Sequence, residues 1–318
     1  MNVSLPLILG GLLLFIYSIT RLSKVMEYIF TERARKIIEG GTKNLLISLV
    51  IGIVSTILLG SSSAVIIIAI IFINARSLTF KNAMGIIMGA NIGTTFSSQL
   101  IALDLGKYAF IPILAGLLIY VFTKSDQWRQ IGKAALFFGL LFFGLFLVQL
   151  AVMPLQENPQ IEQWLMQIEG NPLYGTIMGG LITLIIQSSS ATVGMAIIMG
   201  KQELIGLSAG IAIMLGSELG TCSDTLVATI RGSRQAIKAG VFHLLFNLST
   251  ICLGLLFFSP FVSLIEKLSG NAGLNTQIAN AHVLFNTFGV LIFLPFTGAV
   301  YRLLNHIIPE KNQRQESD

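Results

Sequence analysis

Two serine triplets are the residues whose type and spacing best suit a chemical task. They are Ser61, Ser62 and Ser63, preceded by Gly60, and Ser188, Ser189 and Ser190, preceded by Gln187. Each triplet lies where one apolar run ends and another begins, so we expect it to cap the N-terminus of a helix. Free N–H groups, a partial positive charge and added hydroxyls would make such a helix start a binding site for a small anion. Close helix packing or a turn would also explain one triplet alone.

The triplets belong to a longer internal repeat. Residues 44–94 and 171–221 align without a gap at a constant offset (188 − 61 = 127), with 15 identities in 51 positions. Most of the identities are small or hydroxylated residues. In an apolar chain, a duplicated half with polar breaks at matching places is typical of a transporter whose binding site lies at the repeat interface. We therefore expect the two triplets to meet near the middle of the membrane.

A second repeated motif follows each triplet, GANIGTT at 89–95 and GSELGTC at 216–222. Two glycines four residues apart, flanked by polar residues, predict an unwound stretch whose carbonyls point into a cavity. Carbonyl and hydroxyl oxygens are ligands suited to sodium, and broken helices of transporters use them in this way. The same glycines match the GxxxG pattern of closely packed membrane helices. Both interpretations can hold together.

Glu218 and Asp224 are the two carboxylates that we place at membrane depth. Glu218 takes the position that Asn91 has in the first half of the repeat. A carboxylate at this depth is costly unless it meets a cation, a proton or a partner, so it is functional by default. We expect a cation ligand or a proton-titrating site. Asp224 has an alternative role, as the partner of Arg231 or Arg234 near the cytoplasmic end of its helix.

A histidine–asparagine pair also occurs twice in the chain. His243 and Asn247 are four residues apart, as are His282 and Asn286. Residues at this spacing share one face of a helix, so each pair can join a single hydrogen-bond network. Hydrogen bonds between helices are the favoured interpretation. A proton relay or a catalytic histidine is the alternative.

Composition places the chain in a membrane. Its 318 residues are 54% hydrophobic and 11% charged, with a mean hydropathy of +0.81, whereas a soluble domain has about 25% charged residues. Long runs without alternation exclude transmembrane β-strands. Two cysteines in apolar stretches indicate neither a disulfide nor a metal cluster, and the net charge of +5 needs no nucleic-acid partner. The centres of five candidate spans are 5–19, 108–122, 134–152, 239–258 and 279–300.

The distribution of Lys and Arg predicts the topology. With the N-terminus outside and the C-terminus cytoplasmic, 17 of the 20 Lys and Arg lie on the cytoplasmic side. Loop 21–43 is basic and its counterpart 148–170 has no Lys or Arg, so the positive-inside rule puts them on opposite faces. The arm 45–59 would be about 22 Å long, too short to cross, which favours re-entrant hairpins at 45–73 and 172–200. Segments 22–39 and 155–168 are expected to be interfacial helices.

The expected fold is an all-α polytopic membrane protein with two inverted-topology repeats. Each repeat would hold a re-entrant helical hairpin and a broken transmembrane helix, and scaffold helices would flank the pair. Residues 5–19, 134–152 and 279–300 are the scaffold candidates, which could also form a homodimer interface. The expected divisions are 1–132 for the first repeat, 133–260 for the second, 261–308 for a further C-terminal transmembrane helix and 309–318 for a cytoplasmic tail.

The motif QSSS at 187–190 and the motif GANIGT at 89–94 resemble those of the type II sodium/phosphate cotransporter family. The resemblance covers nearly the whole chain and extends to the helices with His, Phe and Asn. It implies sodium-coupled movement of inorganic phosphate, with the serine hairpins around the substrate and sodium held nearby. Two residues depart from the family pattern, Gly60 in place of Gln and Glu218 in place of Asn. A carboxylate beside an anion site repels phosphate unless a cation or proton neutralises it.

The motifs and the resemblance together give the candidate ligands. For the anion they are Ser61, Ser62, Ser63, Asn91, Thr94, Gln187, Ser188, Ser189, Ser190 and Thr221. For sodium they are Asn91, Thr94, Thr95, Gln187, Glu218, Thr221 and Asp224. No organic cofactor and no catalytic residue are expected.

The predicted function is a sodium-coupled phosphate transporter of the inner cell membrane that works by alternating access, with the direction set by the gradients. Sulfate or another small oxyanion, and coupling to protons, remain alternatives. An intramembrane phosphatase of lipid pyrophosphates is a distant one, because it needs a cationic clamp or metal and no Arg or Lys is near either triplet in the sequence. A channel is the third class, and it predicts flux without saturation or ion coupling.

Overall fold

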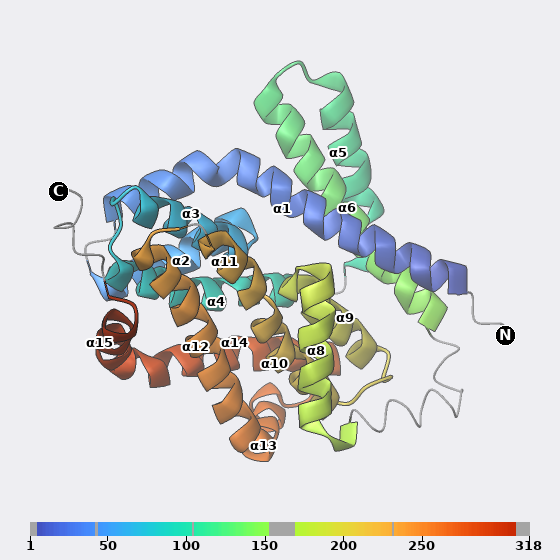
Figure 1. Ribbon diagram of the computed structural model, residues 1–318. Helices are drawn as coiled ribbons and strands as arrows, with labels where there is room; N and C mark the ends of the chain where they lie inside the picture. Colours follow the sequence, from blue (N-terminus) through green and yellow to red (C-terminus); the bar gives the residue numbers. More distant parts are fainter. Residues whose placement is uncertain (1–4, 42–43, 104, 153–168, 231, 310–318) are drawn as a thin grey trace.

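The computed structural model describes residues 5–41, 44–103, 105–152, 169–230 and 232–309, and their regular structure is helical (Figure 1). The helices of the first part are α1 (Leu5–Gly41), α2 (Leu45–Leu59), α3 (Ser62–Asn74), α4 (Phe80–Ala102), α5 (Phe110–Phe122) and α6 (Asp126–Val152). Those of the second part are α8 (Pro172–Ile186), α9 (Ser189–Lys201), α10 (Leu207–Gly220), α11 (Cys222–Thr229), α12 (Arg234–Leu256), α13 (Phe258–Ser269), α14 (Leu274–Phe293) and α15 (Thr297–Ile307). The predicted all-α class is confirmed.

Several of these helices are long and apolar enough to cross a membrane. Five spans among the described residues meet both conditions, and a bent pair, Phe80–Ala102 with Gly106–Phe122, makes a sixth if it is counted as one. The two helices of that pair meet at an angle of 74°. The five spans are Pro6–Gly40, Asp126–Ala151, Leu207–Thr229, Arg234–Leu256 and Leu274–Ile307. The chain is therefore a multi-pass membrane protein.

Helices α2 and α3 form one helical hairpin, and α8 and α9 form another. Each first arm begins at an asparagine N-cap, since the side-chain oxygens of Asn44 and Asn171 accept hydrogen bonds from backbone N–H groups three residues on. Each first arm is 15 residues long, about 22 Å of helix. Each ends at a residue with left-handed backbone, Gly60 (φ 65°) or Gln187 (φ 56°). This conformation stops the helix and turns the chain into the second arm.

Glycine faces hold these hairpins against the two helices that follow them. A Cβ on Gly89 of α4 would lie 1.9 Å from the carbonyl oxygen of Leu49 in α2. A Cβ on Gly216 of α10 would lie 1.8 Å from the carbonyl oxygen of Thr176 in α8. In the repeat, Gly216 corresponds to Gly89 and Thr176 corresponds to Leu49, since both pairs have the offset of 127 residues (216 − 89 = 127 and 176 − 49 = 127). The repeat in the sequence is thus also a repeat in packing.

The predicted unwinding at the glycine motifs is wrong for the first half. Helix α4 runs without a break from Phe80 to Ala102, because its glycines let two helix backbones meet and do not open the helix. The second half does have an interruption, since α10 ends at Gly220 and α11 begins at Cys222. The GxxxG interpretation therefore describes both motifs, and the second helix is interrupted only at Thr221, whose backbone stays in the helical region.

The first helix also differs from the expectation. Residues 22–39 are helical, but they continue the preceding span in a single helix of 37 residues, about 55 Å long. This exceeds the hydrocarbon thickness of about 30 Å, so part of α1 lies outside the membrane core or α1 runs obliquely. The interfacial helix expected at 155–168 and the tail from 310 to 318 lie outside the described residues.

A scaffold of α1, α5 and α6 lies to one side of the other helices. Helix α6 packs along both α1 and α5, and the α5–α6 pair projects away from the rest of the molecule (Figure 1). Helix α14 does not join this scaffold. It packs against α4, α9 and α10 and carries buried His282 and Asn286, so the scaffold role expected for 279–300 is wrong.

We expect Gly216→Ala to lower the free energy of unfolding by about 1–3 kcal/mol or more, because its methyl group would overlap the Thr176 carbonyl. The measurement is the melting temperature of the purified protein in detergent. Gly10→Ala is the matched control, since a Cβ there meets no atom within 4 Å and alanine favours helix over glycine. Equal melting of the Gly216→Ala and wild-type proteins would contradict the packing described.

Candidate functional site

The tips of the two hairpins share one cavity of about 170 Å³. The structure thus brings together two serine triplets that belong to different halves of the sequence. Helix α1 closes a further side of the cavity. The lining residues are Ile19, Thr20, Ser23, Lys24, Glu27, Gly60, Ser61, Ser62, Ser63, Gln187, Ser188, Ser189, Ser190 and Thr221.

The first serine of each triplet caps the second arm of its hairpin, as predicted. Ser61 Oγ accepts a hydrogen bond of 3.2 Å from the N–H of Ala64. Ser188 Oγ accepts one of the same length from the N–H of Ala191. The other serines of each triplet follow within the first turn of α3 or α9, where backbone N–H groups lack partners inside the helix. Two helix starts with partial positive charge therefore border one small cavity.

Asp224 of α11 is attached to the tip of the first hairpin. Its Oδ2 accepts a hydrogen bond of 3.2 Å from Ser63, and its Oδ1 accepts one of 3.4 Å from Ser223. The alternative pairing with Arg234 is absent among the described residues, and Arg231 lies outside them. The second half of the chain thus places a carboxylate on a serine of the first half.

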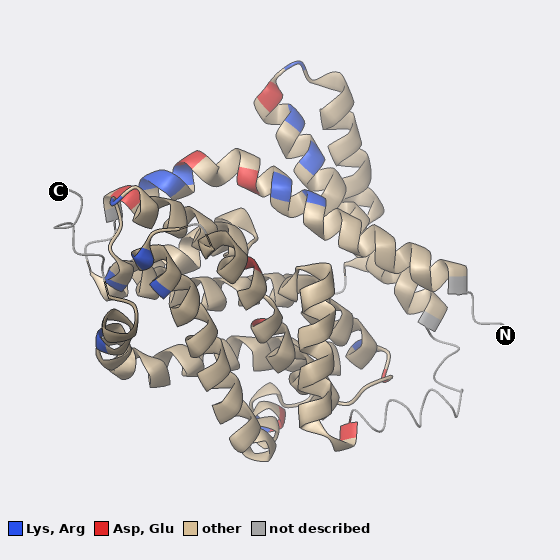
Figure 2. Cartoon of the chain, in the orientation of Figure 1, with Lys and Arg blue, Asp and Glu red and all other residues tan. Residues whose placement is uncertain are grey.

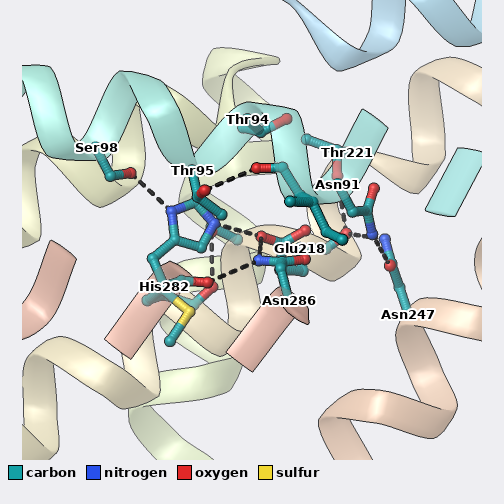
Figure 3. Close-up of polar contacts among 12 residues, drawn as sticks. Asn91, Thr94, Thr95, Ser98, Glu218, Thr221, Asn247, His282 and Asn286 are labelled. Atoms are coloured by element: carbon teal, nitrogen blue, oxygen red, sulfur yellow. Dashed lines mark hydrogen bonds and ion pairs between the residues drawn. The ribbon is translucent and has the colours of Figure 1, made fainter. Parts of the chain in front are cut away.

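Glu218 lies at the centre of a buried polar network (Figure 3). Its side chain is 3% exposed. The carboxylate oxygen Oε1 is 2.7 Å from His282 Nε2 and accepts a hydrogen bond of 3.1 Å from Asn286 Nδ2. His282 Nδ1 in turn lies 2.7 Å from Ser98 Oγ. One carboxylate therefore joins α10 to α14, and the imidazole extends this link to α4.

The other histidine–asparagine pair completes the network. Asn247 Nδ2 donates to the carbonyl oxygen of Glu218 over 2.8 Å, and Asn91 Nδ2 donates to Asn247 Oδ1. His243 Nδ1 lies 3.0 Å from Thr225 Oγ1. The predicted role of both pairs in hydrogen bonds between helices is confirmed.

The network follows the repeat as well. Ser98 and Thr225, which meet the two imidazoles, are separated by the repeat offset (225 − 98 = 127). Asn91 and Glu218, which meet the two asparagines, have the same separation (218 − 91 = 127). Equivalent positions thus hold equivalent partners, with an amide in one half and a carboxylate in the other.

The expected sodium ligands do not form one cluster. Gln187 and Thr221 line the serine cavity, whereas Asn91 and Glu218 lie in the network and Asp224 lies on Ser63. Thr94 and Thr95 donate their hydroxyls to the carbonyl oxygens of Ala90 and Ile92 on their own helix. Among the described residues, no three His, Cys, Asp or Glu side chains are grouped so that they could hold a metal ion.

Thr221 connects the cavity to the network. It lines the cavity, and its hydroxyl donates to the carbonyl oxygen of Glu218 over 2.8 Å. It is also the single residue between the end of α10 at Gly220 and the start of α11 at Cys222. One residue, Thr221, therefore contacts both the cavity and the backbone of Glu218.

Helix α1 supplies cavity residues that the sequence analysis missed. Ser23 Oγ donates to the carbonyl oxygen of Gly60 over 3.4 Å, and Lys24 lines the same cavity. No Lys or Arg lies near the serine triplets in the sequence, but the fold brings Lys24 to the cavity that they line, so the expectation of a site without a cation is wrong. A signal was present: Thr20, Ser23, Lys24 and Glu27 recur at the spacing of one helix face within an apolar helix.

Known proteins are similar to this chain over most of its length. The family model described as Na+/Pi-cotransporter matches residues 14–150 and 153–293. The uncharacterised protein YqeW of Bacillus subtilis is 31% identical over 261 residues, which are 82% of this chain and 84% of YqeW. YjbB of Escherichia coli K12, named as a candidate inorganic phosphate export protein, is 23% identical over 285 residues, 89% of this chain and 52% of YjbB.

A human relative matches a shorter part. The sodium-dependent phosphate transport protein 2B is 36% identical over 101 residues, 31% of this chain and 15% of the human protein. The chain thus spans only about half of YjbB, although it spans most of YqeW. No solved structure matches it significantly. Because the family match takes in most of its length, the chain belongs to the Na+/Pi-cotransporter family, which consists of transporters and not of enzymes.

Proposed function

We propose that this protein carries inorganic phosphate across the cell membrane, coupled to sodium, by alternating access. The observation that carries the proposal is the single cavity between two serine-capped helix starts, in a chain of the Na+/Pi-cotransporter family. A helix start offers N–H donors and partial positive charge to an anion, and serine hydroxyls add donors without charge. The proposed anion ligands, of which all but Asn91 and Thr94 line the cavity, are Ser61, Ser62, Ser63, Asn91, Thr94, Gln187, Ser188, Ser189, Ser190 and Thr221.

The two halves act in this proposal as inverted-topology repeats with re-entrant hairpins. Support comes from backbone conformations that recur at the repeat offset: positive φ at Gly60 and Gln187, and again at Arg76 and Glu203 (203 − 76 = 127). The opposite charge of loops 21–43 and 148–170 supports the inversion. The proposed divisions remain 1–132, 133–260 and 261–308, with a tail at 309–318.

Sodium would neutralise the carboxylates beside the anion. Glu218 and Asp224 bring negative charge next to the proposed phosphate site, and a bound cation removes the repulsion. Carboxylate, amide, hydroxyl and carbonyl oxygens form a donor set that suits sodium. The candidate ligands are Asn91, Thr94, Thr95, Gln187, Glu218, Thr221 and Asp224. Because they do not form one cluster, sodium would bind to a subset of them, and Thr221 lies at the junction between cavity and network.

The direction of transport depends on the gradients. We infer that the basic face is cytoplasmic, with the N-terminus outside and the C-terminus inside. Figure 2 shows Lys and Arg along the later part of α1 and near the α5–α6 turn, which supports this orientation. One elementary charge moving through 100 mV contributes about 2.3 kcal/mol, enough to drive uptake. YjbB of Escherichia coli is named for phosphate export, so efflux is the second candidate.

We expect the purified protein in liposomes to accumulate radiolabelled phosphate above equilibrium when sodium is outside, with saturation at high phosphate. A matched potassium gradient is the control. Vesicles preloaded with phosphate, with sodium reversed, measure efflux. Accumulation driven by a proton gradient alone would contradict sodium coupling, stronger uptake of sulfate would contradict the substrate, and flux without saturation would favour a channel.

Replacing the serines of the tips tests the anion site. We expect Ser62→Ala and Ser189→Ala each to raise the KM for phosphate about tenfold, because the loss of one hydrogen bond to a charged group amounts to about 1.5–3 kcal/mol. Ser55→Ala is the control, since Ser55 is buried on α2, has no hydrogen-bond partner among the described residues and does not line the cavity. If both tip variants kept the wild-type KM, the serine cavity would not bind phosphate.

Replacing Glu218 with glutamine, which has an amide in place of the carboxylate, tests the role of this residue. We expect Glu218→Gln to raise the sodium concentration for half-maximal transport about tenfold or more, since a charged oxygen ligand is lost. Glu266→Gln, at an exposed carboxylate of α13, is the control. The measurement is transport against sodium concentration at saturating phosphate. An unchanged sodium curve would place sodium away from Glu218.

A further inference from the structure

We propose that Lys24 of α1 supplies the positive charge of the anion cavity, and that neighbouring Glu27 competes with the anion for its ammonium group. This inference rests on the proposed function of the serine cavity. Among the described residues that line the cavity, Lys24 is the one cation and Glu27 is the one carboxylate. The serine triplets, Gln187 and Thr221 are all neutral. The α1 segment therefore decides the net charge of the lining.

Four polar residues of α1 lie on the side of the helix that faces the cavity. Thr20, Ser23, Lys24 and Glu27 follow the spacing i, i+3, i+4 and i+7, so they lie along one face of the helix. This face meets the first hairpin directly, because Ser23 Oγ donates to the carbonyl oxygen of Gly60 over 3.4 Å. Buried Val25, one residue after Lys24, anchors another side of this turn.

The two hairpin tips differ in one side chain. The first hairpin has Gly60 where the second has the amide of Gln187 (187 − 60 = 127). A Cβ on Gly60 would meet only Ser23 Oγ, at 3.9 Å, so the space beside this glycine faces α1. The first tip therefore receives its additional polar groups from another helix, whereas the second tip has one in its own sequence.

The ammonium group of Lys24 can offset negative charge at the first tip. Asp224 already accepts a hydrogen bond from Ser63 and so adds negative charge at the first tip. An incoming anion meets this charge, and an ammonium group on the same side offsets it. Glu27 lies within electrostatic range of Lys24, at the i, i+3 spacing that brings two side chains together. The anion and Glu27 then compete for one ammonium group.

The location of Lys24 adds a consequence for transport. Helix α1 packs mainly along α6 and also against α2, whereas the two hairpins pack mainly against α4 and α10. The cation thus belongs to the scaffold and the serines belong to the core. When the core moves relative to the scaffold, the anion leaves the ammonium group and its affinity falls, and Glu27 takes the ammonium group back.

The test compares two variants with opposite expected signs, in the liposome assay and by direct phosphate binding to the purified protein. Lys24→Gln should raise the KM for phosphate about tenfold, equivalent to about 1.4 kcal/mol, with kcat changed less than about twofold. Glu27→Gln should lower the KM about two- to threefold, because a competitor is removed. Lys24→Arg should keep most of the affinity. Lys36→Gln, at an exposed residue farther along α1, should have no effect.

Each outcome decides between the two claims. If the wild-type protein transports phosphate and Lys24→Gln has the wild-type KM, the role of Lys24 is overturned and the proposed function stands. A rise in KM of similar size in both Lys24→Gln and Glu27→Gln would indicate a structural role, and would also overturn it. If the wild-type protein neither binds nor transports phosphate, the proposed function itself fails. Should Lys24→Gln not fold, a normal KM in Glu27→Gln would overturn the inference.

Discussion

At Gly89 and Gly216, the backbone of one helix lies against carbonyl oxygens of a hairpin arm with no space for a side chain. These contacts fix how far each hairpin extends along its neighbouring helix. Since each first arm has the same length of 15 residues from its asparagine cap, fixing the arm also fixes its tip. The serine cavity exists because two such tips are held at matching positions. A glycine on α4 or α10 thus helps to determine the location of the serines at the tip of the hairpin that packs against it.

The polar network performs a complementary task. Glycine contacts hold each hairpin to its own helix, but they do not join the halves. The network around Glu218 joins them: its carboxylate contacts His282 of α14, which reaches Ser98 of α4. Its carbonyl oxygen accepts from Asn247 of α12, which in turn accepts from Asn91 of α4. A buried carboxylate at membrane depth is destabilising unless its oxygens have partners. Here the partners belong to two helices outside the repeated hairpins, so satisfying one charge also orders the core.

Local rules predicted the hairpins, the serine caps and the histidine–asparagine network. An N-cap, a break in an apolar run and an i, i+4 pair each depend on neighbouring residues, so one sequence contains enough information. The glycine motif does not, because Gly89 suits either an unwound stretch or a close contact, and the approach of Leu49 decides between them. Lys24 was missed for a similar reason. It lies in a different helix from either serine triplet, and only the packing of α1 brings it to the cavity.

Similar geometry with different charge is what distinguishes the halves. Asn91 and Glu218 occupy equivalent positions and meet equivalent asparagines, yet one is neutral and the other is a carboxylate. Gly60 and Gln187 share a left-handed backbone, yet only one has a side-chain amide. In the proposed alternating access, two halves with similar packing would let the molecule face each side of the membrane in turn. Under the proposed function, this unequal charge would direct sodium to the second half, where Thr221 lines the serine cavity and donates its hydroxyl to the carbonyl oxygen of Glu218.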